Sequence, residues 1–233
     1  MSDDVKTLID AEIARLGLND NAFFQNFRRQ PLPIEDLTFA CQQYYYYIRT
    51  FPQILAGLSH RVDSEDVRFH LARTVVSELG DGHGPAHFQL FEKSIAAVGV
   101  TLKPYGDVDY IDEAEGLVSG LRRIFLQESP VAAVGGHYTI EETGFPMLDN
   151  LYEGFRLYPG STARSMEYFH LHLFLESDHV SWISMAVATF AKDPRNHPEL
   201  VRGGKEVAEL LARFWDGLNR HTFGRSGAAL ASR

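Results

Sequence analysis

Cysteine is almost absent from this sequence of 233 residues. The single one is Cys41, so no disulfide can form within the chain. A protein without disulfides fits a reducing compartment, and we expect it to be cytoplasmic. Cys41 lies in an apolar helical pattern, where a small core residue is commoner than a nucleophile.

Long apolar runs are also lacking. The longest nearly apolar stretch, residues 182–191, is too short to span a bilayer. The N-terminus does not show the charged-then-apolar pattern of a secretory signal. We therefore expect a soluble protein with no membrane partner.

Basic residues are scarce relative to acidic ones, with 22 Lys and Arg against 31 Asp and Glu and a formal net charge of −9. This balance disfavours nucleic acid and anionic membranes as partners. The chain also has no basic cluster and no zinc-ribbon spacing. The expected partner is a small-molecule substrate, and a helical protein of this size is expected to pair as a homodimer.

Strand-like alternation is lacking too, and helical periodicity covers most of the chain. Eight segments predict helices, at residues 3–18, 33–61, 63–79, 85–99, 112–127, 130–157, 161–192 and 197–223. Short connections, with no repeats and no break in composition, predict one all-α bundle of about seven to eight helices over residues 1–223. The small and polar residues 224–233 are expected to form a flexible C-terminal tail.

One expected helix carries unusually many titratable groups. Residues 167–182 read EYFHLHLFLESDHVSW, with three histidines among apolar side chains. At 100° per residue, His172, Glu176 and His179 fall within about 60° of one another. Leucines and a valine flank this stripe, so it should face the core. Two imidazoles and a carboxylate aimed at one point are suited to binding a metal ion.

Two other segments offer ligands of the same kinds. Glu78 ends one expected helix and His87 begins the next, across a glycine-rich break that permits a sharp turn. Glu141 lies in the apolar context GHYTIEETGF, and because Glu142 points about 100° away, only one of these two acids can face inward. Tyr138, one turn before Glu141, is the candidate catalytic residue lining the site.

These motifs together resemble those of the haem-oxygenase-like di-iron oxidases, a superfamily that includes the chlamydial death-domain-associated protein. They are E-L-G-x-G, a following H with L-F three residues on, G-x-Y-x-x-E, and F-x-x-H-x-x-x-[DE]-x-x-H. The resemblance spans residues 35–185 and implies a haem-oxygenase-like helical fold. It implies six metal ligands: Glu78, His87, Glu141, His172, Glu176 and His179. The gap before His87 varies in the family, so Asp81 is an alternative to Glu78 as the first acid.

The resemblance also implies an activity. The expected cofactor is Fe(II), two ions per chain with the second loosely held, and O2 is the expected co-substrate. Three carboxylates and three histidines suit iron or manganese better than calcium or magnesium. The expected reaction is N-oxygenation or oxidative C–C cleavage of an amino-acid derivative or a fatty acid.

Other functions stay open at this point. Relatives of the same fold include cofactorless and thiaminase-like enzymes, and the thiaminase version requires a positioned cysteine nucleophile. A non-catalytic metal-binding or interaction protein is a further alternative, although the ferritin-like set of two E-x-x-H pairs is not present. Haem is disfavoured, because it usually needs one axial histidine in an apolar pocket.

Overall fold

The computed structural model describes the backbone of residues 2–231 and the side chains of residues 2–175 and 178–224. Within the described backbone, all regular elements are helical, as expected, and no strand occurs. Two 3₁₀ turns, Leu18–Asp20 and Pro194–Asn196, join helices. The α-helices are α1 (Ser2–Arg15), α2 (Ala22–Phe27), α3 (Ile34–Arg61), α4 (Glu65–Glu78), α5 (His87–Ala97), α6 (Asp112–Leu126), α7 (Pro130–Phe155), α8 (Glu167–Phe190) and α9 (His197–Ala231).

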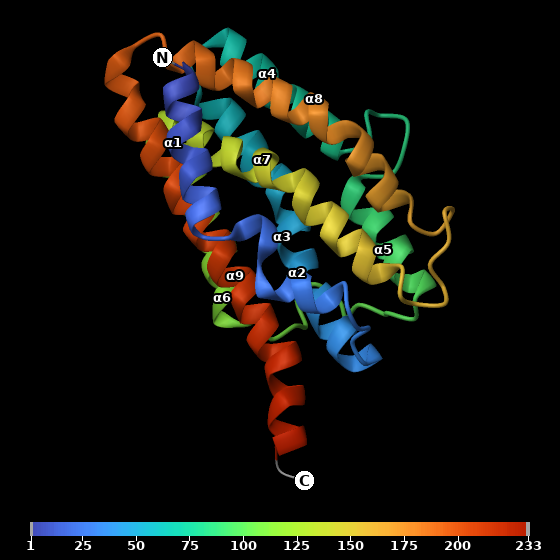
Figure 1. Cartoon of the computed structure of the whole chain (residues 1–233). Helices are drawn as coiled ribbons and strands as arrows, with labels where there is room; N and C mark the ends of the chain where they lie inside the picture. The colour runs from blue at the N-terminus through green and yellow to red at the C-terminus, as the bar shows by residue number, and fades with distance from the viewer. Residues whose placement is uncertain (1, 232–233) are drawn as a thin grey trace.

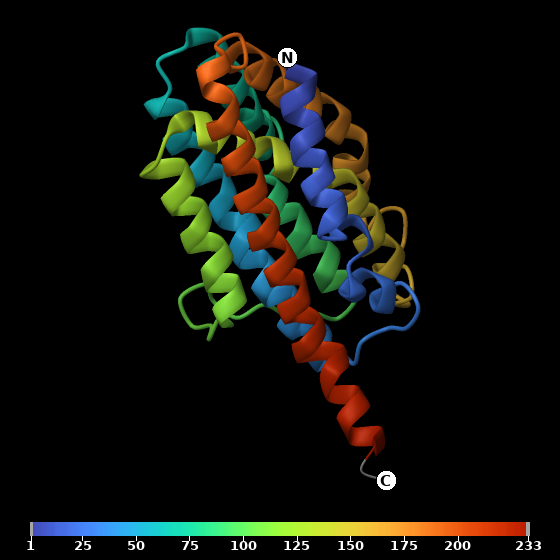
Figure 2. The same ribbon diagram turned by 60° about the vertical axis from the view of Figure 1, so that its left-hand side comes forward.

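Two features differ from the helices expected from the sequence. The short helix α2 was not expected; its six residues bury Phe23, Phe24 and Phe27, and Asn21 caps it by accepting from the Phe23 amide. Helix α9 continues to Ala231, so the end expected at residue 223 is wrong. Its last turns project away from the other helices (Figures 1 and 2). Flexibility of residues 224–233 stays a prediction.

Helix α7 is the central element of the bundle (Figure 1). It packs against α8 on one side and α9 on the other, while α3 packs against α4 and α6, and α4 packs against α8. Its residues from Ala132 to Glu141 are all buried, which is typical of a helix enclosed on every side. One continuous cluster of buried apolar side chains joins these helices. Among the helices described here, none combines the length and apolarity that crossing a membrane requires.

Two glycines allow α7 and α9 to cross in backbone contact. A Cβ atom on Gly135 of α7 would lie 1.9 Å from the carbonyl oxygen of Leu200. A Cβ atom on Gly203 of α9 would lie 1.8 Å from the carbonyl oxygen of Ala132. The obstructing atoms belong to backbone, so no change of rotamer can relieve the overlap. The crossing therefore fixes the position of α7 and of the side chains that it carries.

We predict that Gly135→Ala and Gly203→Ala each lower the free energy of unfolding by about 1–3 kcal/mol, the usual cost of overpacking. Urea unfolding followed by circular dichroism measures this. Gly116→Ala in α6 is the matched control, because nothing lies within 4 Å of a Cβ there. Alanine favours helix by up to about 1 kcal/mol over glycine, so the control should be as stable as the unmodified chain or more so. Unchanged stability of both crossing variants would contradict the backbone contact.

Candidate metal centre

A tight turn between α4 and α5 brings the first two candidate ligands together. The amides of Gly80 and Asp81 donate to carbonyl oxygens of the last turn of α4, which ends the helix immediately after Glu78. Gly80 has φ 83°, and a Cβ atom there would lie 2.5 Å from the carbonyl oxygen of Gly84. Glycine is therefore required at this position. The reversal places Glu78, at the end of α4, beside His87, the first residue of α5.

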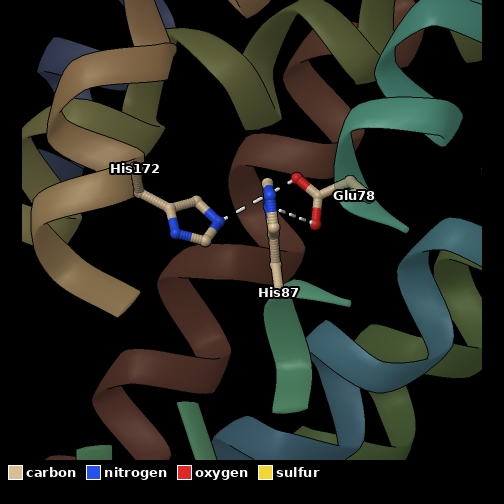
Figure 3. Close-up of side chains that lie close together, drawn as sticks. All are labelled: Glu78, His87 and His172. Atoms are coloured by element: carbon tan, nitrogen blue, oxygen red, sulfur yellow. Dashed lines mark ion pairs between the residues drawn. The ribbon is translucent and has the colours of Figure 1, made fainter. Parts of the chain in front are cut away.

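The Glu78 carboxylate lies among three imidazoles. Its Oε2 is 3.3 Å from Nδ1 of His87, and its Oε1 is 4.0 Å from both Nε2 of His172 and Nδ1 of His179. All three histidines are buried. Figure 3 shows Glu78, His87 and His172 converging from α4, α5 and α8. One ligand atom from each of these three residues lies within 4.8 Å of the other two.

Helix α7 contributes a second carboxylate to the same cluster, and this one, Glu141, is buried. Oε2 of Glu141 is 3.4 Å from Nδ1 of His179, so His179 lies between the two acids. Oε1 of Glu141 is 2.6 Å from Nε2 of His137, one turn earlier in α7. The sequence interpretation assigned no role to His137, although its i, i+4 spacing to Glu141 places both on one helix face.

In His172 and His179, the ring nitrogen that points away from the cluster makes a hydrogen bond, and this orients the other nitrogen towards the cluster. Nδ1 of His172 donates to the carbonyl oxygen of Tyr168 at 2.8 Å, which leaves Nε2 without its proton and directed at Glu78. Nε2 of His179 is 3.1 Å from the Ser77 hydroxyl, and Nδ1 faces the acids. Outer contacts of this kind orient histidine ligands in metal sites.

The structure places the acids of the two open alternatives differently. Glu78 faces the histidines, whereas Asp81 is exposed on the turn. Glu141 faces the cluster, whereas Glu142 points about 100° away and interacts with Asp10 and Tyr138. Five of the six expected ligands thus lie together: Glu78, His87, Glu141, His172 and His179. Glu176 lies in α8, but its side chain is outside the described residues.

The placement of Tyr138 corrects the sequence interpretation. Its hydroxyl donates to Asp10 of α1 at 3.0 Å, and it does not line the cavity beside the metal ligands. One residue corresponds to about 100° on a helix, so Tyr138 and its neighbour His137 point in different directions. The structure therefore does not support a catalytic position for Tyr138.

A cavity of about 50 Å³ adjoins the cluster and is bounded by Glu78, His87, Glu141 and His172. The rest of its wall is aromatic and aliphatic, including Tyr44, Tyr47, Phe51, Phe88, Met147 and Tyr168. The hydroxyls of Tyr44 and Tyr168 lie 3.0 Å apart. Among the described lining residues, none is lysine or arginine. The cavity therefore offers a small, largely apolar space next to the candidate ligands.

Electrostatics favour the metal-binding protonation states of two acids and one histidine in the cluster. Burial by itself raises the pKa of the Glu78 carboxyl, but contact with His87 and the charges of the nearby imidazoles outweigh burial and lower it. The pKa of Glu141 is lowered in the same way by His179 and His137. Burial lowers the pKa of His172 to about 4, so its imidazole is neutral at pH 7. Ionised carboxylates and neutral imidazoles are the ligand forms of these residues.

The donor set fits iron. Nδ1 of His87 is buried and has no hydrogen-bond partner, although Glu78 lies beside it. Buried polar atoms normally have partners, and a cation between Nδ1 and the carboxylate would satisfy both. A mixture of imidazole and carboxylate ligands suits iron and related transition metals. His87, His172 and Glu78 are therefore the ligands that the described geometry supports first.

Comparisons with known proteins also point to iron. Residues 39–212 match a family model described as iron-containing redox enzyme. The chain is 22% identical over 218 residues to 4-chloro-allylglycine synthase of Streptantibioticus cattleyicolor, covering 92% of the chain and 84% of that protein. It is 24% identical over 208 residues to 4-aminobenzoate synthase of Chlamydia pneumoniae, covering 89% and 91%.

Solved structures confirm the expected fold. A CADD-like protein of unknown function from Nostoc punctiforme aligns with a TM-score of 0.78 at 18% identity, covering 93% of this chain and 97% of that one. A domain with a haem-oxygenase-like fold from Shewanella denitrificans aligns with a TM-score of 0.70 at 16% identity, covering 93% of this chain and 89% of that one. A TenA homologue from Pyrococcus furiosus also aligns with a TM-score of 0.70 at 16% identity, covering 94% of this chain and 100% of that one.

We predict that His172→Ala weakens ferrous iron binding by at least about 100-fold. Loss of a residue that only hydrogen-bonds to a metal ligand costs up to about 100-fold, and loss of the ligand itself should cost at least as much. Anaerobic titration with ferrous iron measures this affinity. His170→Ala is the matched control, because this residue on the same helix contacts the Tyr152 hydroxyl at 3.0 Å and not the cluster. Equal iron affinity of the two variants would remove His172 from the ligand set.

A second prediction concerns His137, which holds one oxygen of Glu141. We expect His137→Ala to weaken iron binding by about 10-fold, as for other residues that orient a ligand. His137→Gln should recover part of the affinity, because its amide can donate to Glu141. Wild-type affinity in His137→Ala would show that Glu141 is held without this contact. A loss as large as that of His172→Ala would make His137 a direct ligand.

Proposed function

Because the chain belongs to the family of iron-containing redox enzymes, we propose that it is a non-haem di-iron oxidase or oxygenase acting on a small molecule with O2. The observation that carries this proposal is the position of Glu78, which lies among His87, His172 and His179, with Glu141 next to His179. A carboxylate in this position can bridge two cations and reduce their mutual repulsion.

The ligands divide into two groups around Glu78. His87 and His172 would hold one iron, His179 and Glu141 would hold the second, and Glu78 would contribute its carboxylate to both. Glu176 would complete the second group, as the resemblance to the family implies. A pair of ferrous ions bound there would supply the electrons that reduce dioxygen.

The surrounding side chains have distinct tasks. The Tyr168 carbonyl and the Ser77 hydroxyl keep the imidazoles of His172 and His179 oriented, and His137 holds Glu141. The aromatic and aliphatic wall of the cavity excludes bulk water, which protects reactive species formed from O2 and strengthens electrostatic interactions.

The substrate is proposed to be an amino-acid derivative or a fatty acid, oxidised at nitrogen or by C–C cleavage. The names of the two relatives, 4-chloro-allylglycine synthase and 4-aminobenzoate synthase, support small amino-containing compounds. The cavity wall supports a reacting portion that is not anionic, since the described lining residues include two carboxylates and no lysine or arginine. Arg49 lies over the Tyr105 ring at 4.2 Å and does not line this cavity.

A thiaminase-like reaction has less support, despite the similarity in fold to a TenA homologue. Such a reaction requires an activated cysteine. Cys41 is fully buried, and burial raises the pKa of its thiol, so the reactive thiolate is suppressed.

The proposal predicts that the chain binds two ferrous ions anaerobically and then consumes O2 when mixed with air-saturated buffer. An oxygen electrode measures uptake, and a colorimetric assay measures bound iron. Glu78→Gln should lose both the bound iron and the O2 uptake, because it removes the negative charge between the two proposed iron positions. Glu115→Gln is the control, since Glu115 is exposed on α6.

Two results would contradict the proposal. Rapid O2 uptake by Glu78→Gln would show that the cluster is not the reacting centre. Stoichiometric iron binding with no O2 uptake would instead indicate a metal-binding protein without oxidase activity.

A further inference from the structure

A second cavity lies beside the one at the metal centre, and Tyr44 forms part of the wall of both. Its volume is about 20 Å³, and it is enclosed by side chains of α2, α3, α5, α7 and α9. None of the lining residues is more than 5% exposed. The surface facing the cavity is entirely apolar.

Water is a poor occupant for this space. A buried water needs two to four polar partners, and an apolar cavity of this kind stays dry. The free volume is nevertheless sufficient for one small molecule, since about 10–15 Å³ holds a molecule of water size. A small apolar molecule is therefore the fitting occupant.

Rigid aromatic packing keeps the cavity open. Phe23 stacks on Trp215 with ring centroids 5.5 Å apart, and Phe27 meets Phe155 edge-on at 5.4 Å. Gly154 lies against the Phe27 ring so closely that a Cβ atom there would be 2.1 Å from it. Lining atoms around a void lose dispersion contacts, so the void weakens the core in which it lies.

Tyr44 is the partition between this cavity and the metal centre. Its hydroxyl lies 3.0 Å from that of Tyr168, and the Tyr168 ring lies 4.3 Å from the His172 ring. Movement of one side chain would therefore connect the apolar cavity with the space beside the candidate ligands. A molecule held in the cavity is separated from that space by a single residue.

We propose that the apolar cavity behind Tyr44 binds dioxygen and passes it to the metal centre. Dioxygen is apolar and diatomic, and it needs no hydrogen-bond partner. The assignment of a gas to this cavity rests on the proposed oxidase function. Binding itself can be tested without iron, so failure of one proposal is distinguishable from failure of the other.

The first test is nuclear magnetic resonance of the full, iron-free chain with labelled methyl groups, under several bar of O2. Paramagnetic O2 speeds the relaxation of nearby methyl groups. The methyls of Leu37, Leu151 and Leu218 line the cavity and should show excess relaxation. Leu121 and Ile124 are buried in the same core away from the cavity and provide the internal control. Equal relaxation of the two sets would overturn the proposal.

The second test fills the cavity. Ala40→Val adds two methyl groups at the wall, and the excess relaxation should disappear. In iron-loaded protein, the same variant should need a higher O2 concentration for half-maximal uptake, with iron affinity unchanged. Ala14→Val on the exposed face of α1 is the matched control. It should alter neither the methyl relaxation nor the O2 concentration for half-maximal uptake. Unchanged O2 dependence in Ala40→Val would overturn delivery through the cavity.

If the unmodified chain consumes no O2, the proposed function fails, and the relaxation measurement still decides whether the cavity binds dioxygen. If uptake is normal but the cavity methyls show no excess relaxation, the function stands and the cavity proposal is wrong.

Discussion

The Glu78 carboxylate lies among the imidazoles of His87, His172 and His179 inside the helical bundle, with Glu141 next to His179. Removing ionised carboxylates from water is costly unless charge and hydrogen bonds replace the lost solvation. The imidazoles provide part of this compensation, but Nδ1 of His87 is buried without a hydrogen bond although Glu78 lies 3.3 Å away. A bound cation would satisfy both, which connects the burial of these groups with their function.

Backbone constraints deliver these side chains to one place. The left-handed residues of the α4–α5 turn fix the distance between Glu78 and His87, and they depend on Gly80. The backbone contact of α7 with α9, through Gly135 and Gly203, fixes the helix that carries Glu141. The metal centre thus depends on glycines outside the ligand set, because a Cβ atom at any of them would displace a ligand-bearing element.

The sequence predicted the helices and most of the cluster for identifiable reasons. A separation of seven residues puts His172 and His179 on one face of a helix whatever its neighbours are. Helix α2 was missed because its six residues are too few to show a period. The extension of α9 was missed because its glycine- and serine-rich end has weak helix propensity.

The sequence interpretation misjudged two residues of α7, His137 and Tyr138, for the same reason. This helix is buried on all sides, so hydrophobic periodicity does not indicate which face meets the site. His137 therefore looked like an ordinary core residue, and Tyr138 was assigned to the site although it faces Asp10. Only the packing of α1, α8 and α9 around α7 distinguishes these faces, and such long-range contacts are not encoded in local spacing.

Anomalous diffraction at the iron edge, from crystals soaked anaerobically in ferrous iron, tests the central claim most directly. The account predicts two peaks on either side of the Glu78 carboxylate, one next to His87 and His172 and the other next to His179 and Glu141. Iron located elsewhere in the molecule, or no peak within bonding distance of Glu78, would contradict it.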